Sequence, residues 1–252
     1  MTQFSYQLYS SRNFPPLEAV LDRLAALGVE TVEGYGGLYP TVADARDLAA
    51  ALVKAGLKMR SGHMGLDLVE ERPDEAVEIA GFLGLEQVFV PYLQAPDRPS
   101  DADDWRAFGA RLVSAGAPIR AAGLTYGWHN HDFEYMPLPT GELPIDLILD
   151  GNDLSLEFDV AWSFVAGKDP METIQRYGSR IAAAHVKDRA PDGEKGDEDG
   201  WADLGDGRVD WPGCLTALKA AGCKNFVLEH DNPSDDQRFA SRSLAYLHSL
   251  EG

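Results

Sequence analysis

The chain has 252 residues, of which 44% are hydrophobic and 25% charged, proportions that fit a globular protein with a large core and exclude a disordered chain. Lysine and arginine number 22 against 41 aspartates and glutamates, so the net charge of −19 opposes binding to a nucleic-acid backbone. The N-terminus lacks a basic region followed by an apolar stretch, and no apolar run is long enough to span a membrane, so we expect a cytoplasmic protein with a small-molecule partner.

Short strand-like segments alternate with amphipathic segments along the chain. The eight predicted strands are residues 4–10, 31–37, 58–65, 86–93, 125–131, 155–162, 181–188 and 225–231. Five segments show the helical spacing of apolar residues, and each ends on a glycine that is expected to stop the helix. They are residues 16–28, 43–56, 74–84, 169–178 and 210–222. A doubly wound sheet usually has fewer strands and a GxGxxG loop, which is absent here. Eight strands with intervening helices therefore predict an α/β fold, a single (β/α)8 TIM barrel domain over residues 1–252.

The longest irregular segment, residues 189–210, is acidic and rich in glycine. It follows the seventh strand, a position where barrel enzymes place active-site loops. We expect its charges to be solvated, and Trp201 is a candidate lid residue.

Polar and ionisable side chains fall near the carboxyl ends of most predicted strands. They are Gln7, Glu33, His63, His129, His131, Asp159, His185, Lys187 and Glu229. In a parallel barrel these strand ends form one rim, where the chemistry collects. On the seventh strand, alternation places Ile181, Ala183 and His185 on one face, so small and apolar side chains lie beneath the polar tip.

Three of these residues form a set that is typical of metal ligands. Asp159, His185 and Glu229 offer two carboxylates and an imidazole, which suit Mn²⁺, Mg²⁺, Co²⁺ or Zn²⁺, and Mn²⁺ is our first choice. A fourth ligand is needed. Glu134, in the loop after the fifth strand, is the first candidate and His131 the second, because spacing alone does not decide which of them reaches the ion.

Several segments resemble, in order along the chain, the sugar phosphate isomerase/epimerase superfamily of xylose isomerase-like barrels. They are YQLYSSR at Tyr6, HNHDFEY at His129, FDVAWSFVAGKDP at Phe158, RIAAAHVKD at Arg180, DGRVDW at Asp206 and VLEHD at Val227. The resemblance covers nearly the whole chain, and it implies that Asp159, His185 and Glu229 are three of four ligands of one divalent ion. The fourth ligand is normally a glutamate of the fifth strand, but it lies earlier in that strand, where this chain has Gly127 and Trp128.

The resemblance also implies a reaction, the isomerisation or epimerisation of a ketose or keto-sugar. Such enzymes remove a proton beside a carbonyl and return it elsewhere, while a divalent ion stabilises the enediolate. The candidate proton carriers are Glu229, Glu134 and His131. The residues expected to contact a sugar or polyol-derived substrate are His63, His129, Lys187, Glu33, Gln7 and, as part of an apolar wall with Trp128 and Phe133, Trp162.

Other functions would use the same residues. If the enolate expels a leaving group, the enzyme is an inosose-type dehydratase or a 3-keto-glycoside lyase. A barrel that binds sugars without catalysis is the alternative from another class. An abasic-site endonuclease would share the fold, but the charge of −19 opposes it, as does the expected lack of extra His and Glu ligands for a zinc cluster. Relatives in this superfamily also suggest a homo-oligomer.

Overall fold

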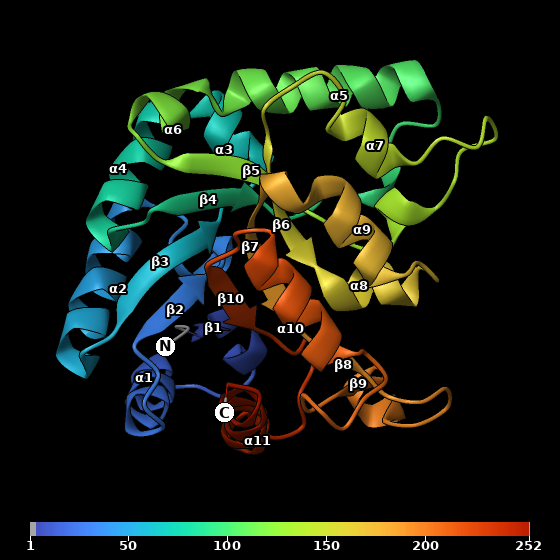
Figure 1. Cartoon of the computed structure of the whole chain (residues 1–252). Coiled ribbons are helices and arrows are strands. Elements are labelled where there is room, and N and C mark those ends of the chain that lie inside the picture. The colour runs from blue at the N-terminus through green and yellow to red at the C-terminus, as the bar shows by residue number, and fades with distance from the viewer. Residues whose placement is uncertain (1–3, 252) are drawn as a thin grey trace.

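The computed structural model describes residues 4–251, and its centre is a closed barrel of eight parallel strands (Figure 1). The strands are β1 (Phe4–Gln7), β2 (Thr31–Gly34), β3 (Lys58–His63), β4 (Gln87–Val90), β5 (Thr125–His129), β6 (Ser155–Asp159), β7 (Ile181–Val186) and β10 (Asn225–Leu228). They follow one another in chain order around the barrel, and β1 pairs with β10 to close it. The predicted TIM barrel is therefore confirmed.

Helices surround the barrel (Figure 1). They are α1 (Leu17–Ala26), α2 (Val42–Ala55), α3 (Leu66–Glu71), α4 (Pro73–Leu83), α5 (Ala102–Ala115), α6 (Ala117–Ala121), α7 (Pro144–Ile148), α8 (Val160–Val165), α9 (Pro170–Tyr177), α10 (Trp211–Ala220) and α11 (Asp236–Ser249). The five clearest predicted helices correspond to α1, α2, α4, α9 and α10. No helix within residues 4–251 has both the length and the apolar character that crossing a membrane requires.

Local sequence explains most of the helix ends. The Thr41 side chain caps α2 by accepting from the Asp44 backbone N–H, and Gly56 ends this helix with φ of 75°. Gly178, after α9, departs from the expected stop: its φ is −48°, and it begins a short 3₁₀ turn that leads into β7. A Cβ at Gly178 would lie 2.9 Å from the Cβ of Ala221, so close packing beside α10 explains this glycine.

Polar side chains fill much of the barrel interior. The Asn225 amide donates to Ser61 Oγ at 3.0 Å and to Gln87 Oε1 at 2.8 Å, which ties three strands together across the barrel. Buried polar groups need such partners, because an unpaired donor in the core costs free energy. The interior is therefore already a hydrogen-bonded network below the strand ends.

The segment of residues 189–210, which we call the β7–α10 segment, is more ordered than an open acidic loop. β8 (Asp188–Arg189) pairs with β9 (Trp201–Ala202), and the Asp188 carboxylate accepts four backbone N–H groups within or beside the segment. The expectation that its charges are solvated is wrong for Glu198 and Asp203, which are buried. The reason is Arg238 of α11, whose guanidinium binds both carboxylates.

Candidate functional site

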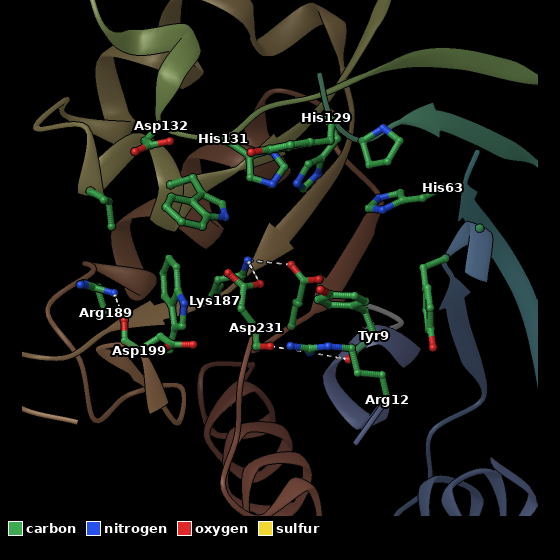
Figure 2. Close-up of a pocket in the computed structure, with 18 residues that line it drawn as sticks. Tyr9, Arg12, His63, His129, His131, Asp132, Lys187, Arg189, Asp199 and Asp231 are labelled. Carbon is green, nitrogen blue, oxygen red and sulfur yellow. Dashed lines mark hydrogen bonds and ion pairs between the residues drawn. The ribbon is translucent and has the colours of Figure 1, made fainter. Parts of the chain in front are cut away.

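A cavity of about 760 Å³ opens at the carboxyl ends of the strands (Figure 2). This volume lies within the roughly 300–1,000 Å³ that is usual for small-molecule sites. The residues predicted to form the site that also line the cavity are His63, His129, His131, Trp162, Lys187 and Glu229. They lie at or just after the carboxyl ends of β3, β5, β6, β7 and β10, in agreement with the single polar rim expected from the sequence.

Aromatic rings form part of the cavity wall. The rings of Trp162 and Trp201 meet edge to face with centroids 4.8 Å apart, and the Lys187 ammonium lies 5.6 and 4.9 Å from their centroids. The β7–α10 segment therefore brings its candidate lid residue to the cavity. Trp128, the other tryptophan proposed for this wall, instead packs against Phe108 of α5 and is fully buried.

Lys187 holds three carboxylates together at the cavity floor. Its Nζ lies 2.7 Å from Glu229 Oε2, 3.1 Å from Asp159 Oδ2 and 2.7 Å from Asp231 Oδ1. Burial opposes the charge, but the three carboxylates outweigh burial and raise the pKa of Lys187 well above its ordinary value. The sequence reasoning missed Asp231, although it lies two residues beyond Glu229 and thus shares its parity.

Asp159 reaches the site through the start of α8. Its Oδ1 accepts from the Trp162 backbone N–H, and Asn130 clamps the Asp159 backbone through two hydrogen bonds of 3.0 and 3.1 Å. The other oxygen, Oδ2, is buried and has no hydrogen-bond partner within residues 4–251. Asp159 is thus both a helix cap and, through Oδ2, an ion-pair partner of Lys187 at 3.1 Å.

His185 connects the rim to the barrel interior. Its Nδ1 lies 2.8 Å from Glu229 Oε2 and 3.9 Å from Asp159 Oδ2, while its Nε2 lies 2.7 Å from Glu33 Oε1. Burial opposes a charged imidazole, but Glu157, Glu229 and Glu33 outweigh it and raise the pKa of His185 well above the ordinary value. In the ion-free protein this imidazole can donate from both ring nitrogens.

Glu33 and Gln7 were predicted to contact substrate, but neither is among the described residues that line the cavity. Both are fully buried, and Gln7 Nε2 donates to Glu33 Oε1 at 2.8 Å. Glu33 also accepts from Ser61 Oγ. Their position supports His185 from below, because a carboxylate on one ring nitrogen fixes which nitrogen faces the rim.

The structure brings Glu157, which the sequence reasoning missed, to the centre of three imidazoles. Its Oε2 lies 2.6 Å from His63 Nε2, 3.1 Å from His129 Nδ1 and 3.4 Å from His185 Nε2. Burial and the charge of His185 lower the pKa of His129 to about 4. Alternation along β6 could have revealed Glu157, since it precedes Asp159 by two residues and faces the same way.

Glu134, the first candidate for a fourth ligand, lies apart from Asp159, His185 and Glu229. Its oxygens accept from Trp128 Nε1 at 2.8 Å and from the His131 backbone N–H at 2.9 Å. Burial raises the pKa of Glu134 to about 8. The carboxylate thus fixes the turn that carries His131.

His131 itself lines the cavity, beside His129, with ring centroids 5.0 Å apart. Its Nδ1 is buried and has no hydrogen-bond partner within the described part of the chain. Burial, followed by the nearby His129 and Lys187, lowers the pKa of His131 well below its usual range. A neutral imidazole at this wall can give or accept a proton only through a ligand or water in the cavity.

The rim residues fit a divalent cation. Ligand atoms of Asp159, His185 and Glu229 lie within 4.8 Å of one another, and all three side chains are buried. Two carboxylates and one imidazole form the oxygen-rich set that Mn²⁺, Mg²⁺ and Zn²⁺ accept, and Asp159 Oδ2 has no hydrogen-bond donor within residues 4–251, only the ion pair with Lys187. Lys187 shares these oxygens, so an ion there would face its ammonium.

Eight parallel strands closed into a barrel, with carboxylates and imidazoles gathered beside one cavity at their carboxyl ends, define a TIM barrel with a candidate small-molecule site. The sequence then gives the family. The chain belongs to the xylose isomerase-like TIM barrel family, whose model matches residues 21–250.

Individual relatives are distant. The chain is 25% identical over 243 residues to the rhizopine catabolism protein MocC of Rhizobium meliloti. The aligned region covers 84% of this chain and 74% of that protein. A sugar phosphate isomerase/epimerase structure from Parabacteroides distasonis ATCC 8503 superposes with a TM-score of 0.83 at 22% identity, covering 98% of this chain and 94% of that one. The structure of the IOLI protein, solved with a bound zinc atom, superposes with a TM-score of 0.76 at 16% identity. The match covers 99% of this chain and 98% of that one.

Proposed function

We propose that this protein is a divalent-metal-dependent isomerase or epimerase of a ketose or keto-sugar, which acts by abstracting a proton next to a carbonyl. The observation that carries the proposal is the convergence of Asp159, His185 and Glu229 beside a cavity of small-molecule size. A bound ion would supply stabilisation for the enediolate oxygen. Family membership supports a sugar-type substrate, and Mn²⁺ is the first candidate ahead of Mg²⁺, Co²⁺ and Zn²⁺.

Glu229 and His131 are the proposed proton carriers. Both line the cavity, and Nδ1 of His131 has no partner in residues 4–251 that would compete with a substrate. Glu229 Oε2 is hydrogen-bonded to His185 Nδ1 and forms an ion pair with Lys187, and these contacts would hold the carboxylate in place while a substrate proton moves. Glu134 acts indirectly in this proposal, by fixing the backbone of His131.

Substrate contacts are assigned to side chains on the cavity wall. Lys187 would donate to a sugar oxygen, and Trp162 would cover an apolar sugar face. His63 and His129 reach the same cavity from β3 and β5. Gln7 and Glu33 would influence the substrate through His185, since they are bonded beneath it.

A dehydratase or 3-keto-glycoside lyase is the second candidate. Elimination needs room for a leaving group, and a cavity of about 760 Å³ lies in the upper part of the roughly 300–1,000 Å³ range for small-molecule sites. The same carboxylates and imidazoles would serve that reaction. Simple sugar binding is less well supported, because binding alone does not require a buried cluster of proton carriers.

The experiment that tests the proposal measures metal content and proton exchange together. The purified protein is analysed for bound metals, then incubated in D₂O with a panel of ketoses, inosose and 3-keto-glucosides. We expect solvent deuterium to enter at least one substrate, and loss of water or of an aglycone would identify the eliminating alternative. A protein that binds a sugar but exchanges no proton with any of them would be a binding barrel.

The Glu229→Gln variant tests the assigned role. It should lose turnover by roughly 10²-fold or more, as expected for a missing proton carrier, while its circular dichroism spectrum stays that of the wild type. Glu18→Gln, an exposed change on α1, is the matched control and should keep full activity. Near-normal turnover in Glu229→Gln would remove this carboxylate from the mechanism.

A further inference from the structure

We propose that the barrel holds a second divalent cation, bound by His63, His129 and Glu157. We call this the inner site, and the set of Asp159, His185 and Glu229 the outer site. Ligand atoms of His63, His129, Glu157 and His185 all lie within 4.8 Å of one another, and all four side chains are buried. Because Glu157 precedes Asp159 by two residues on β6, the inner site lies one step below the rim.

The ligand atoms of the inner site lie at hydrogen-bond distance, slightly closer together than the ligands of a bound ion. Glu157 Oε2 lies 2.6 Å from His63 Nε2 and 3.1 Å from His129 Nδ1. Ligands about 2.0–2.2 Å from a tetrahedral zinc ion are separated by roughly 3.3–3.6 Å. Small side-chain movements would therefore open a coordination shell where these atoms now contact one another.

Glu157 supplies a second, independent observation. Its other oxygen, Oε1, is buried and has no hydrogen-bond partner within residues 4–251. A buried carboxylate oxygen without a donor is costly, and a bound cation would satisfy it. His63 and His129 line the cavity, so an ion could enter without passing through the barrel wall.

The net negative charge around the two sites also favours a second cation. Five carboxylates and one ammonium lie here: Glu33, Glu157, Asp159, Glu229, Asp231 and Lys187. Ligation requires neutral imidazoles, and in that state these groups leave four negative charges. One divalent ion at the outer site would halve this excess. A second ion at the inner site would complete the neutralisation of a largely buried cluster.

His185 separates the two sites. Its Nδ1 faces Glu229 at 2.8 Å, while its Nε2 is closer to Glu33, at 2.7 Å, than to Glu157, at 3.4 Å. We therefore assign His185 to the outer site, with Nε2–H donating to Glu33. The inner site then has two imidazoles and one carboxylate, with a coordination position open towards the cavity for water or a substrate oxygen.

The two sites should prefer different metals. Imidazole-rich sets favour Zn²⁺ and Co²⁺, whereas carboxylate-rich sets also accept Mn²⁺ and Mg²⁺. The inner site is accordingly a Zn²⁺ or Co²⁺ site in a barrel whose outer site takes Mn²⁺. In this arrangement His63 and His129 contact the substrate through an ion.

The test measures metal stoichiometry in the full-length protein after removal of metals with a chelator. Mn²⁺ is added first, then Zn²⁺ or Co²⁺, and bound metal is counted by mass spectrometry after desalting. We expect two equivalents in the wild type. Four-coordinate Co²⁺ with imidazole ligands absorbs strongly in the visible range, so the inner site should give a coloured protein.

Variants identify the site of each ion. Glu157→Gln and His63→Gln should each lose one equivalent and the Co²⁺ absorption, and two separate variants guard against one of them misfolding. Asp159→Asn should lose the Mn²⁺ equivalent and keep the Co²⁺ absorption. His248→Gln, an exposed histidine of α11, is the matched control and should keep both equivalents.

The wild type could bind only one equivalent of metal. If Glu157→Gln and His63→Gln keep that equivalent and Asp159→Asn loses it, the inner site is overturned and the proposed function stays intact. A single equivalent with the opposite pattern would support the inner site and remove the metal basis of the proposed function. The two proposals therefore fail on different variants.

Discussion

Replacing Lys187 by methionine tests the electrostatics of the cavity floor. Lys187 is 1% exposed, and its ammonium pairs with Asp159, Glu229 and Asp231 at 2.7–3.1 Å. Methionine keeps much of the side-chain volume, so the main loss is the charge. Removing one partner of a buried ion pair costs about 3–5 kcal/mol, and we expect the unfolding free energy to fall by about 4 kcal/mol in the presence of a chelator.

Adding Mn²⁺ should narrow this difference. An ion at the outer site would neutralise the same carboxylates that Lys187 pairs with, and without the opposing ammonium it should bind more tightly. Each tenfold gain in affinity stabilises the variant by about 1.4 kcal/mol relative to the wild type at saturating Mn²⁺. We therefore expect the gap to close by about 1–3 kcal/mol, that is, by one to two factors of ten in affinity.

Urea unfolding followed by tryptophan fluorescence, with a chelator and with Mn²⁺, measures both effects. Lys54→Met, an exposed change on α2, is the control and should alter stability by no more than about 0.5 kcal/mol in either condition. If Lys187→Met loses less than about 1 kcal/mol of unfolding free energy in the chelator, the ammonium does not stabilise the three carboxylates. If Mn²⁺ leaves the difference in unfolding free energy between wild type and Lys187→Met unchanged, an ion at the outer site is refuted.

Three further changes test the fold around the site. Asp188→Ala removes the acceptor of four backbone N–H groups and should lower the unfolding free energy by about 3 kcal/mol. It should also speed proteolysis of the β7–α10 segment, and a segment as resistant as in the wild type would contradict this role of Asp188. Burial opposes the charge of Glu198, but hydrogen bonds from Ser234 and Arg238 together outweigh burial and lower the pKa of Glu198 from 4.5 to about 2. Ionised Glu198 therefore stabilises the fold above about pH 4.5, and this contribution disappears as the pH falls towards 2. In urea unfolding, Glu198→Gln should cost up to about 3 kcal/mol at pH 7 and less at pH 3, and equal costs would refute the assignment. Gly127→Ala should lower the melting temperature sharply, because its Cβ would clash with the backbone of Ser155. Gly81→Ala on α4 has open space around it and should stabilise the fold by about 0.5–1 kcal/mol. Similar shifts in melting temperature for the two variants would contradict the clash at Gly127.

The barrel could be predicted because local signals agree with the fold along most of the chain. Apolar spacing, as in Ala45, Leu48 and Leu52 of α2, defines helix faces that pack on the strands. Strand ends could be predicted less well, since β10 ends at Leu228 and Glu229 follows it. The rim nevertheless forms as expected, because parallel strands bring their carboxyl ends together whatever the last paired residue is.

Hydrogen-bond partners could not be predicted from spacing. Glu33 follows the polar pattern of the rim, yet Gln7, Ser61 and His185 bind it beneath the cavity, and only tertiary structure determines that choice. Glu134 shows the same limit, because a turn after β5 directs its carboxylate to Trp128 and the backbone. Glu157 differs: it was missed in the sequence analysis, although period-two alternation puts it on the same face of β6 as Asp159.

The departure from the superfamily pattern in the fifth strand follows from the backbone. A Cβ at Gly127 would lie 2.1 Å from the carbonyl oxygen of Ser155, so this inward position of β5 has no room for a glutamate. Position 128 faces outward, where Trp128 packs on Phe108. Neither position can supply a ligand, and the group of candidate ligands at the outer site consists, among the described residues, of Asp159, His185 and Glu229. An ion held by three protein ligands would keep coordination positions open for substrate oxygens, as the proposed metal-dependent reaction requires.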